Sequence, residues 1–321
     1  MGHNNESRRS FLKKSIIGAS LALGAAIMPN GVMAAPASKK HKKAKTKRVL
    51  MIALDGICVE GFEKASTPNL DALLSKGALS KTTRVVMPSV TQPNWMSHLS
   101  GSGPEQHGVD ANGWTLTNHK LDPVDADPDG YYPTIFKVLK DGVPNMKTAF
   151  YYNWGPLINP YNQRYIDEVS FEDDDKYLGN YAKAIEFMKR NVNDPTAIFL
   201  YSVHTDHAGH EHAWMSPEYI ASIEEADKNI GDLLEKMESE GLTDGAHIMF
   251  ISDHGGINHG HGGMSPQEMI VPWGITGPGI KKGFTIEEPN NTVNTAAVVA
   301  ALFGVEKPLC WTGEIPESIF K

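Results

Sequence analysis

The sequence has few cysteines, which excludes a scaffold held together by disulfides. Only Cys58 and Cys310 occur in 321 residues, and two are too few for such a framework. Nothing in the sequence shows whether the two are neighbours, so their pairing stays open. The fold must depend on a hydrophobic core, and a hydrophobic content of 40% is ordinary for a globular protein with a sizeable one.

Basic residues are scarce outside the N-terminus, which disfavours a nucleic-acid partner. The first 48 residues carry eleven Lys and Arg against one Glu, which leaves 19 basic and 37 acidic residues for the rest. A body that acidic is a poor candidate for neutralising nucleic-acid phosphates. Its carboxylates suit divalent cations better, although most of them must be solvated surface groups.

The sequence also lacks an apolar run typical of a permanent membrane helix. The run at residues 16–28 is short, contains glycine and is followed by Pro29. It follows Ser7-Arg8-Arg9-Ser10-Phe11-Leu12-Lys13, which matches a twin-arginine export signal. We therefore predict a cleaved signal peptide over residues 1–35, read by the twin-arginine translocation machinery, and a periplasmic or otherwise exported protein. An uncleaved anchor is the alternative, and residues 36–48 are expected to form a basic linker.

Buried strands alternate with helices along residues 49–321, which predicts an α/β fold. Continuous apolar or β-branched runs predict strands at residues 49–54, 82–87, 148–152, 197–203 and 246–251. Helical patterns fall at residues 67–74, 132–140, 172–191, 216–241 and 292–304. This alternation indicates a doubly wound, mostly parallel sheet with helices on both faces. Without an internal repeat or a Pro/Gly-rich linker, residues 49–321 are expected to form a single domain.

Thr91 occupies a special position, at the start of a short helix that follows the strand predicted at residues 82–87. Free backbone N–H groups and the helix dipole favour an anion at such a position. We hypothesise that Thr91 is a nucleophile activated by metal ions. The ordinary alternative is that Thr91 is a helix N-cap.

Asp and His residues follow the predicted strands at the edge where doubly wound sheets bind ligands. They are Asp55, Asp206, His210, Asp253, His254 and either His259 or His261. Isolated buried carboxylates are costly unless they are paired or bound to metal. A mixed Asp/His set suits zinc, and six ligands exceed the need of one tetrahedral ion, so we expect two divalent ions, most simply Zn²⁺.

These ordered motifs resemble the alkaline phosphatase superfamily, and within it the nucleotide pyrophosphatase/phosphodiesterase branch. The resemblance spans residues 49 to about 305. It implies that one zinc is held by Asp206, His210 and His261, and the other by Asp55, Asp253 and His254 together with the nucleophile Thr91. It also implies that Asn112 holds a phosphoryl oxygen. His261, and not His259, fits the family pattern because it lies in Gly260-His261-Gly262-Gly263.

The chain departs from that branch at two places. Gln92 stands where an aromatic residue often stacks on a nucleobase, and only residues 255–260 stand where a long insertion usually lies. Four aromatic residues near the site in sequence could replace the stacking residue, although each could equally be a core residue: Trp95, Trp114, Tyr152 and Trp154.

The residue types favour an exported two-zinc phosphodiesterase or nucleotide pyrophosphatase acting on a small phosphate ester. Thr91 cannot mature to the formylglycine that a sulfatase needs, and no Arg follows it before Arg164 to bind a monoester dianion. A phosphomonoesterase or phosphonate hydrolase is the alternative on the same scaffold. A non-catalytic metal- or ligand-binding protein is the alternative from another class.

Overall fold

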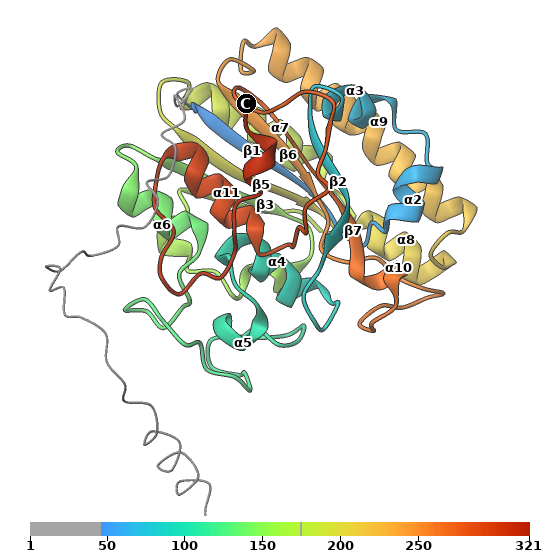
Figure 1. Cartoon of the computed structure of the whole chain (residues 1–321), viewed down its shortest axis with the longest axis horizontal. Helices are drawn as coiled ribbons and strands as arrows, with labels where there is room; N and C mark the ends of the chain where they lie inside the picture. Colours follow the sequence, from blue (N-terminus) through green and yellow to red (C-terminus); the bar gives the residue numbers. More distant parts are fainter. Residues whose placement is uncertain (1–45, 174) are drawn as a thin grey trace, which may run out of the picture. The chain divides into compact units, whose positions relative to one another are not determined.

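The computed structural model describes residues 46–173 and 175–321, which form an eight-stranded sheet with helices on both faces (Figure 1). The strand order is β4-β3-β5-β1-β6-β7-β2-β8. The strands are β1 (Arg48–Leu54), β2 (Gly77–Arg84), β3 (Lys147–Tyr152), β4 (Glu168–Phe171), β5 (Thr196–Ser202), β6 (Ala246–Ile251), β7 (Ile270–Thr276) and β8 (Phe284–Thr285).

The sheet is mostly parallel, as the sequence predicts. β1 lies at its centre and pairs in parallel with β5 on one side and β6 on the other. Only β7 runs against its neighbours β6 and β2 among the described strands. All seven residues of β1 are buried, which explains why its sequence is continuously apolar after Arg48 and does not alternate.

Helices cover the two faces of the sheet in separate groups. Alternate residues of β1 divide between two apolar clusters, with Met51 in one and Ile52 in the other. The first cluster includes α4 (Thr91–Ser100), α6 (Ile135–Gly142) and α11 (Asn294–Phe303). The second includes α2 (Val59–Lys64), α3 (Pro68–Leu74), α7 (Leu178–Arg190) and α9 (Pro217–Ser239). Three further helices are α5 (Pro104–His107), α8 (His204–His212) and α10 (Pro266–Met269).

The bounds predicted for the strand at residues 82–87 are wrong. β2 runs over Gly77–Arg84, and the chain leaves the sheet at Val85. The β-branched run that suggested the strand therefore covers only its last residues and the connection to α4. The strand itself contains Gly77 and Lys81, which the pattern of apolar residues did not reveal.

Several predictions about the termini and the surface can be compared with the described residues. The predicted signal peptide lies outside them, as does the linker up to residue 45, and β1 begins at Arg48. No helix in residues 46–173 or 175–321 combines the length and apolarity needed to cross a bilayer.

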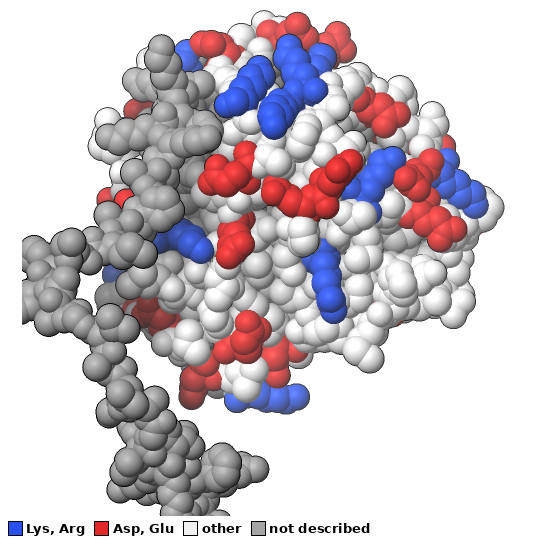
Figure 2. All heavy atoms as spheres, viewed as in Figure 1, with Lys and Arg blue, Asp and Glu red and all other residues white. Residues whose placement is uncertain are grey.

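Cys58 and Cys310 are both free. On the face shown in Figure 2, Lys and Arg are interspersed with Asp and Glu.

Helix α4 is fixed to the rest of the domain by buried histidines. His98 bridges two other elements, with Nδ1 2.7 Å from Thr295 Oγ1 and Nε2 3.0 Å from the Ser252 carbonyl oxygen. His107 accepts the Val109 N–H at Nδ1 and contacts Ser97 Oγ through Nε2. Burial lowers the pKa of His98 to about 4 and that of His107 to about 3. Both rings are therefore neutral in the fold.

We expect these histidines to make the protein acid-sensitive. In the unfolded chain they bind protons near pH 6.5, but the fold keeps them neutral, so stability is fully present above pH 6.5 and falls towards pH 4. Each such histidine contributes a slope of about 1.4 kcal/mol per pH unit. In denaturant titrations, the free energy of unfolding should fall less for His107→Gln than for the wild type as the pH is lowered from 6.5 to 4.5. Equal losses in the two proteins would contradict this.

Candidate active site

The carboxyl ends of β1 and β6 bring three predicted ligands together. Asp55 follows β1, and Asp253 and His254 follow β6, the strand paired with it. All three side chains are fully buried. His254 Nε2 lies 3.4 Å from Asp55 Oδ1 and 3.2 Å from Asp253 Oδ2. Residues almost 200 positions apart in the sequence therefore meet because parallel strands end at one edge.

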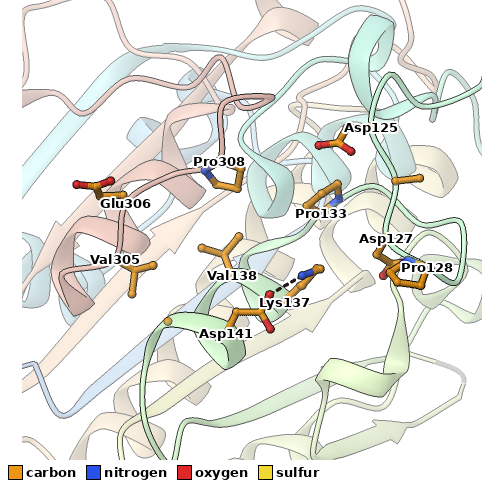
Figure 3. Close-up of a pocket in the computed structure, with 12 residues that line it drawn as sticks. Asp125, Asp127, Pro128, Pro133, Lys137, Val138, Asp141, Val305, Glu306 and Pro308 are labelled. Atoms are coloured by element: carbon orange, nitrogen blue, oxygen red, sulfur yellow. Dashed lines mark hydrogen bonds and ion pairs between the residues drawn. The ribbon is translucent and has the colours of Figure 1, made fainter.

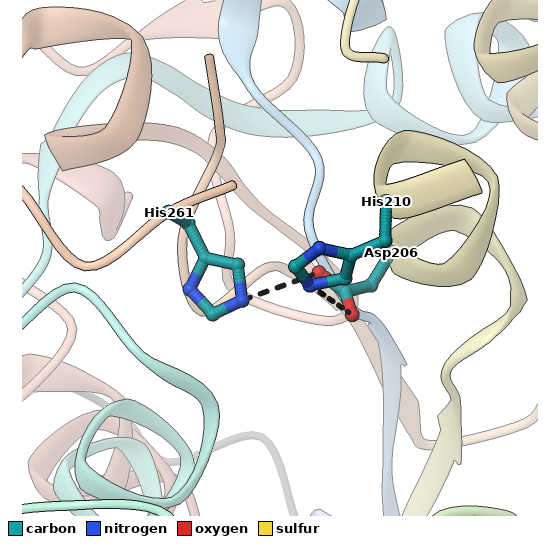
Figure 4. A group of neighbouring side chains, drawn as sticks. All are labelled: Asp206, His210 and His261. Carbon is teal, nitrogen blue, oxygen red and sulfur yellow. Dashed lines mark ion pairs between the residues drawn. The ribbon is translucent and has the colours of Figure 1, made fainter. Parts of the chain in front are cut away.

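The other predicted ligands come from α8 and from the chain segment after β6. Asp206 and His210 lie one turn apart on α8, which follows β5. Figure 4 shows the imidazoles of His210 and His261 each turning a nitrogen towards the Asp206 carboxylate. His210 Nε2 lies 3.5 Å from Asp206 Oδ2, and His261 Nε2 lies 3.7 Å from Asp206 Oδ1. Gly56 allows α8 to approach β1 this closely, since a Cβ there would lie 2.9 Å from Asp206 Cα.

These side chains form two groups with the geometry of metal ligands. One group contains Asp206, His210 and His261, and the other contains Asp55, Asp206 and His254. A tetrahedral zinc site with bonds of about 2.1 Å has ligand atoms about 3.4 Å apart. The carboxylate oxygens that face the histidines, Asp55 Oδ1, Asp206 Oδ1 and Asp253 Oδ2, are buried and accept no hydrogen bond in the described part of the chain. The residues present therefore fit divalent metal ions.

The histidines are held in the tautomer that a metal requires. In His210, His254 and His261, Nδ1 lies 2.9–3.0 Å from a backbone carbonyl oxygen, which is that of His259, Gly255 and Ser89 respectively. A carbonyl oxygen only accepts, so Nδ1 carries a proton in each ring, and Nε2 is the nitrogen left to coordinate a metal. Burial also lowers the pKa of His254 and of His261, which keeps both rings neutral.

Burial makes the three carboxyl groups weaker acids than usual. It raises the pKa of Asp206 to about 7, with a further contribution from the charge of Asp175. Burial and the charge of Asp206 raise the pKa of Asp55 well above its usual range, and burial with the charge of Asp55 does the same for Asp253. No Lys or Arg of residues 46–173 or 175–321 forms an ion pair with these three carboxyl groups. A cation in the site would remove this unfavourable charge.

Thr91 lies against the buried group and is not a helix cap. It is the first residue of α4, whose N-cap is Val90. Because Thr91 already lies inside the helix, its hydroxyl caps no backbone N–H, and Oγ1 instead lies 3.3 Å from His254 Nε2. The interpretation of Thr91 as an ordinary N-cap is therefore wrong. The hydroxyl, at a helix N-terminus, is placed where an anion is favoured.

Asn112 is oriented by the residue that follows Thr91. The Gln92 backbone N–H donates to Asn112 Oδ1 at 2.9 Å, which leaves the Asn112 NH₂ group free to donate elsewhere. The Gln92 side chain is itself occupied, since Nε2 donates to the Pro156 carbonyl and Oε1 accepts the Trp114 N–H. Gln92 therefore links α4 to the 3-10 helix at Gly155–Ile158 and to the loop that contains Trp114, and its buried amide offers no surface to a ligand.

The aromatic candidates have different environments. Trp95 is fully buried beneath Asp55, where Nε1 lies 3.4 Å from Asp55 Oδ2, so it cannot contact a substrate and that prediction is corrected. Trp114 is 5% exposed and stacks on His119. Tyr152 is also largely buried, whereas Trp154 is half-buried.

Sequence reasoning missed three residues that contact either the ligand groups or one of the predicted aromatic residues. The Tyr201 hydroxyl donates to Asp55 Oδ2 and so leaves Oδ1 to face His254. Phe171, at the end of β4, is 45% exposed with its ring 5.1 Å from that of Tyr152. No local motif marks either residue, because each depends on pairing between strands distant in sequence.

Trp214 is the third missed residue and contacts two of the histidines. Its ring centroid lies 5.1 Å from that of His210 and 5.9 Å from that of His261, and Nε1 donates to the Gly56 carbonyl. A Cβ at Gly209 would lie 2.7 Å from the Trp214 ring, so the helix needs a glycine there. Gly209, between Asp206 and His210, is a sequence signal that something packs closely against α8. The sequence does not show that Trp214 is the residue that packs there.

A hollow elsewhere is unsuitable for phosphate esters. The hollow has a volume of about 540 Å³, and none of the predicted site residues lines it. Figure 3 shows the residues that do. Its walls include Asp125, Asp127, Asp141 and Glu306, and its Lys137 is paired with Asp141. Acidic walls repel anionic ligands.

The family model that matches this chain belongs to the alkaline phosphatase superfamily, and the sheet topology and the Asp/His groups at its carboxyl edge agree with that class. Within it, the chain belongs to the type I phosphodiesterase / nucleotide pyrophosphatase family, whose model matches residues 49–264.

Similar proteins include several curated relatives. An uncharacterized pyrophosphatase/phosphodiesterase of Schizosaccharomyces pombe is 26% identical over 64% of this chain and 44% of its own length. A human bis(5'-adenosyl)-triphosphatase is 26% identical over 65% of this chain and 47% of its own length. The chain thus spans about half the length of these relatives.

Solved structures share the fold. Murine ectonucleotide pyrophosphatase/phosphodiesterase 5, determined as an inactive threonine-to-alanine variant in complex with AMP, superposes with a TM-score of 0.72. It is 15% identical, and the match covers 86% of this chain and 100% of that one. The human counterpart gives a TM-score of 0.71 at 16% identity, over 85% of this chain and 99% of that one.

The raised carboxyl pKa values predict how the metal-free protein responds to pH. The folded chain retains protons that the unfolded chain releases near pH 4, so the fold loses stability as pH rises through the folded pKa of about 7 for Asp206. After chelation, the melting temperature of the wild type relative to that of Asp206→Asn should fall between pH 6.5 and 8.5, because the histidines of the unfolded chain titrate equally in both proteins. A constant difference between the two melting temperatures over this range would contradict the account.

Proposed function

We propose that this protein is an exported phosphodiesterase that holds two Zn²⁺ ions and uses Thr91 as its nucleophile. One observation carries the proposal: the Thr91 hydroxyl lies 3.3 Å from His254 Nε2, beside two groups of side chains that fit metal ions. Family membership supports the reaction class. Export rests on the twin-arginine motif in residues 7–13, with a signal peptide over 1–35, a linker over 36–48 and a catalytic domain over 49–321.

The proposed ligands divide into two sets, one for each ion. Asp206, His210 and His261 would hold one ion, and Asp55, Asp253, His254 and Thr91 the other. When bound, the ions would lower the pKa of the Thr91 hydroxyl and compensate the charge of the phosphoryl group. Mixed imidazole and carboxylate ligands are the set that zinc accepts.

The protein's own groups then account for transfer and hydrolysis. Thr91 Oγ attacks phosphorus after losing its proton, the bond from phosphorus to the leaving-group oxygen breaks, and that oxygen takes up a proton. Water then hydrolyses the resulting threonyl phosphodiester, which releases the phosphate monoester and restores the Thr91 hydroxyl. The free NH₂ group of Asn112 donates to a non-bridging oxygen, in the orientation that the Gln92 N–H imposes.

The substrate is proposed to be a small phosphodiester, with a nucleotide as one possibility. AMP in the murine relative suggests the class of ligand. Gln92 cannot stack on a base, but half-buried Trp154 and exposed Phe171 offer aromatic surface near the carboxyl ends of β3 and β4. A monoesterase or phosphonate hydrolase would use the same ligands, so substrate comparison must separate these activities.

The test compares zinc-loaded wild type with Thr91→Ala on bis(p-nitrophenyl) phosphate and p-nitrophenyl phosphate. The wild type should cleave the diester faster, and Thr91→Ala should lose at least about 1,000-fold in kcat because the nucleophile is gone. Thr91→Ser, which keeps a hydroxyl, should retain part of the activity.

Metal analysis provides the control. Thr91→Ala should still contain metal, since the Asp and His ligands remain. Faster monoester cleavage would contradict the diesterase assignment, and a zinc-loaded wild type without esterase activity would favour a metal- or ligand-binding protein.

A further inference from the structure

A tight turn at residues 257–260 connects the buried ligands to His261. Ile257 and Gly260 exchange both backbone hydrogen bonds, at 2.9 and 3.1 Å, and Asn258 has a φ of +53°. Positive φ is tolerated by Asn in such turns. The turn docks on the end of α8, where the Trp214 N–H donates to the Asn258 carbonyl at 2.7 Å.

His259, in this turn, and His210, on α8, bind each other reciprocally. His210 Nδ1 donates to the His259 carbonyl at 2.9 Å, and His259 Nδ1 donates to the His210 carbonyl at 2.9 Å. The His210 carbonyl belongs to the last turn of α8, whose oxygens lack partners within the helix. The His259 side chain therefore caps the helix and fixes its own carbonyl where it orients the His210 ring.

His210 needs this support more than the other members of its metal group. Its side chain is 43% exposed, whereas those of Asp206 and His261 are 7% and 8% exposed. An exposed imidazole retains rotamers that must be given up when it binds a metal. The Trp214 ring contacts one edge of His210, and the His259 carbonyl fixes the direction of Nε2.

We propose that His259 is a positioning residue that sets the metal affinity of the group Asp206-His210-His261 without being a ligand. It acts on this group alone, because Asp55, Asp253 and His254 are held by β1, β6 and their own buried contacts. The inference rests on the proposed two-metal site.

Zinc titration against a competing chelator tests this role. The wild type should bind two zinc ions, and His259→Ala should weaken one of the two affinities by about 10- to 100-fold, as losses of outer-sphere partners of metal ligands do. The second affinity should stay unchanged. His259→Asn, whose amide can donate from nearly the same place as Nδ1, should recover most of the loss.

His212→Ala is the matched control. His212 is also an exposed histidine at the end of α8, and its Nε2 lies 3.8 Å from Glu211 Oε1, away from the proposed ligands. Both zinc affinities should therefore remain at wild-type values. If His259→Ala keeps both wild-type affinities, or loses affinity equally at both sites, the inference is overturned. The proposed function would not be affected by either result. A wild type that binds no zinc would instead overturn the proposed function, and this inference with it.

Discussion

Three carboxylates share one buried space at the carboxyl edge of the sheet, and the rest of the site is arranged around their charge. Asp55 and Asp253 are fully buried and Asp206 is 5% exposed. Removing such ions from water costs several kcal/mol each unless an opposite charge compensates. In the described part of the chain these carboxylates are paired with histidines and form no ion pair with Lys or Arg. The charge balance therefore calls for cations from outside the chain, and the ligand geometry fits them.

This constraint explains why so much of the structure serves to aim individual oxygens and nitrogens. The Tyr201 hydroxyl and the Gly56 N–H each occupy one oxygen of Asp55 or Asp253, so that the second oxygen faces His254. Backbone carbonyls fix the proton on Nδ1 of each site histidine. These contacts come from strands, loops and α8, and they converge because the central strands of the parallel sheet end together. The fold thus prepares the site before any ligand is bound.

The sequence predicted the sheet, its helices and the approach of the ligands, because buried parallel strands have continuous apolar runs and polar residues at their ends. The choice between His259 and His261 followed from the Gly-His-Gly-Gly pattern, and the structure brings His261 into the group. The prediction failed where tertiary contacts decide the outcome. Four features depend on neighbours that are distant in sequence. They are the bounds of β2, the burial of Trp95 under Asp55, the contact of Trp214 with His210 and the exposed ring of Phe171. Local patterns contain no information about such partners.

The central claim is that the buried carboxylates and histidines bind two metal ions beside Thr91. Anomalous diffraction from crystals of the zinc-loaded protein at the zinc absorption edge tests it most directly. The account predicts two anomalous peaks, one among Asp206, His210 and His261, and one among Asp55, Asp253 and His254 in contact with Thr91 Oγ1. No peak at these side chains, or zinc only at surface histidines such as His207 and His212, would contradict it.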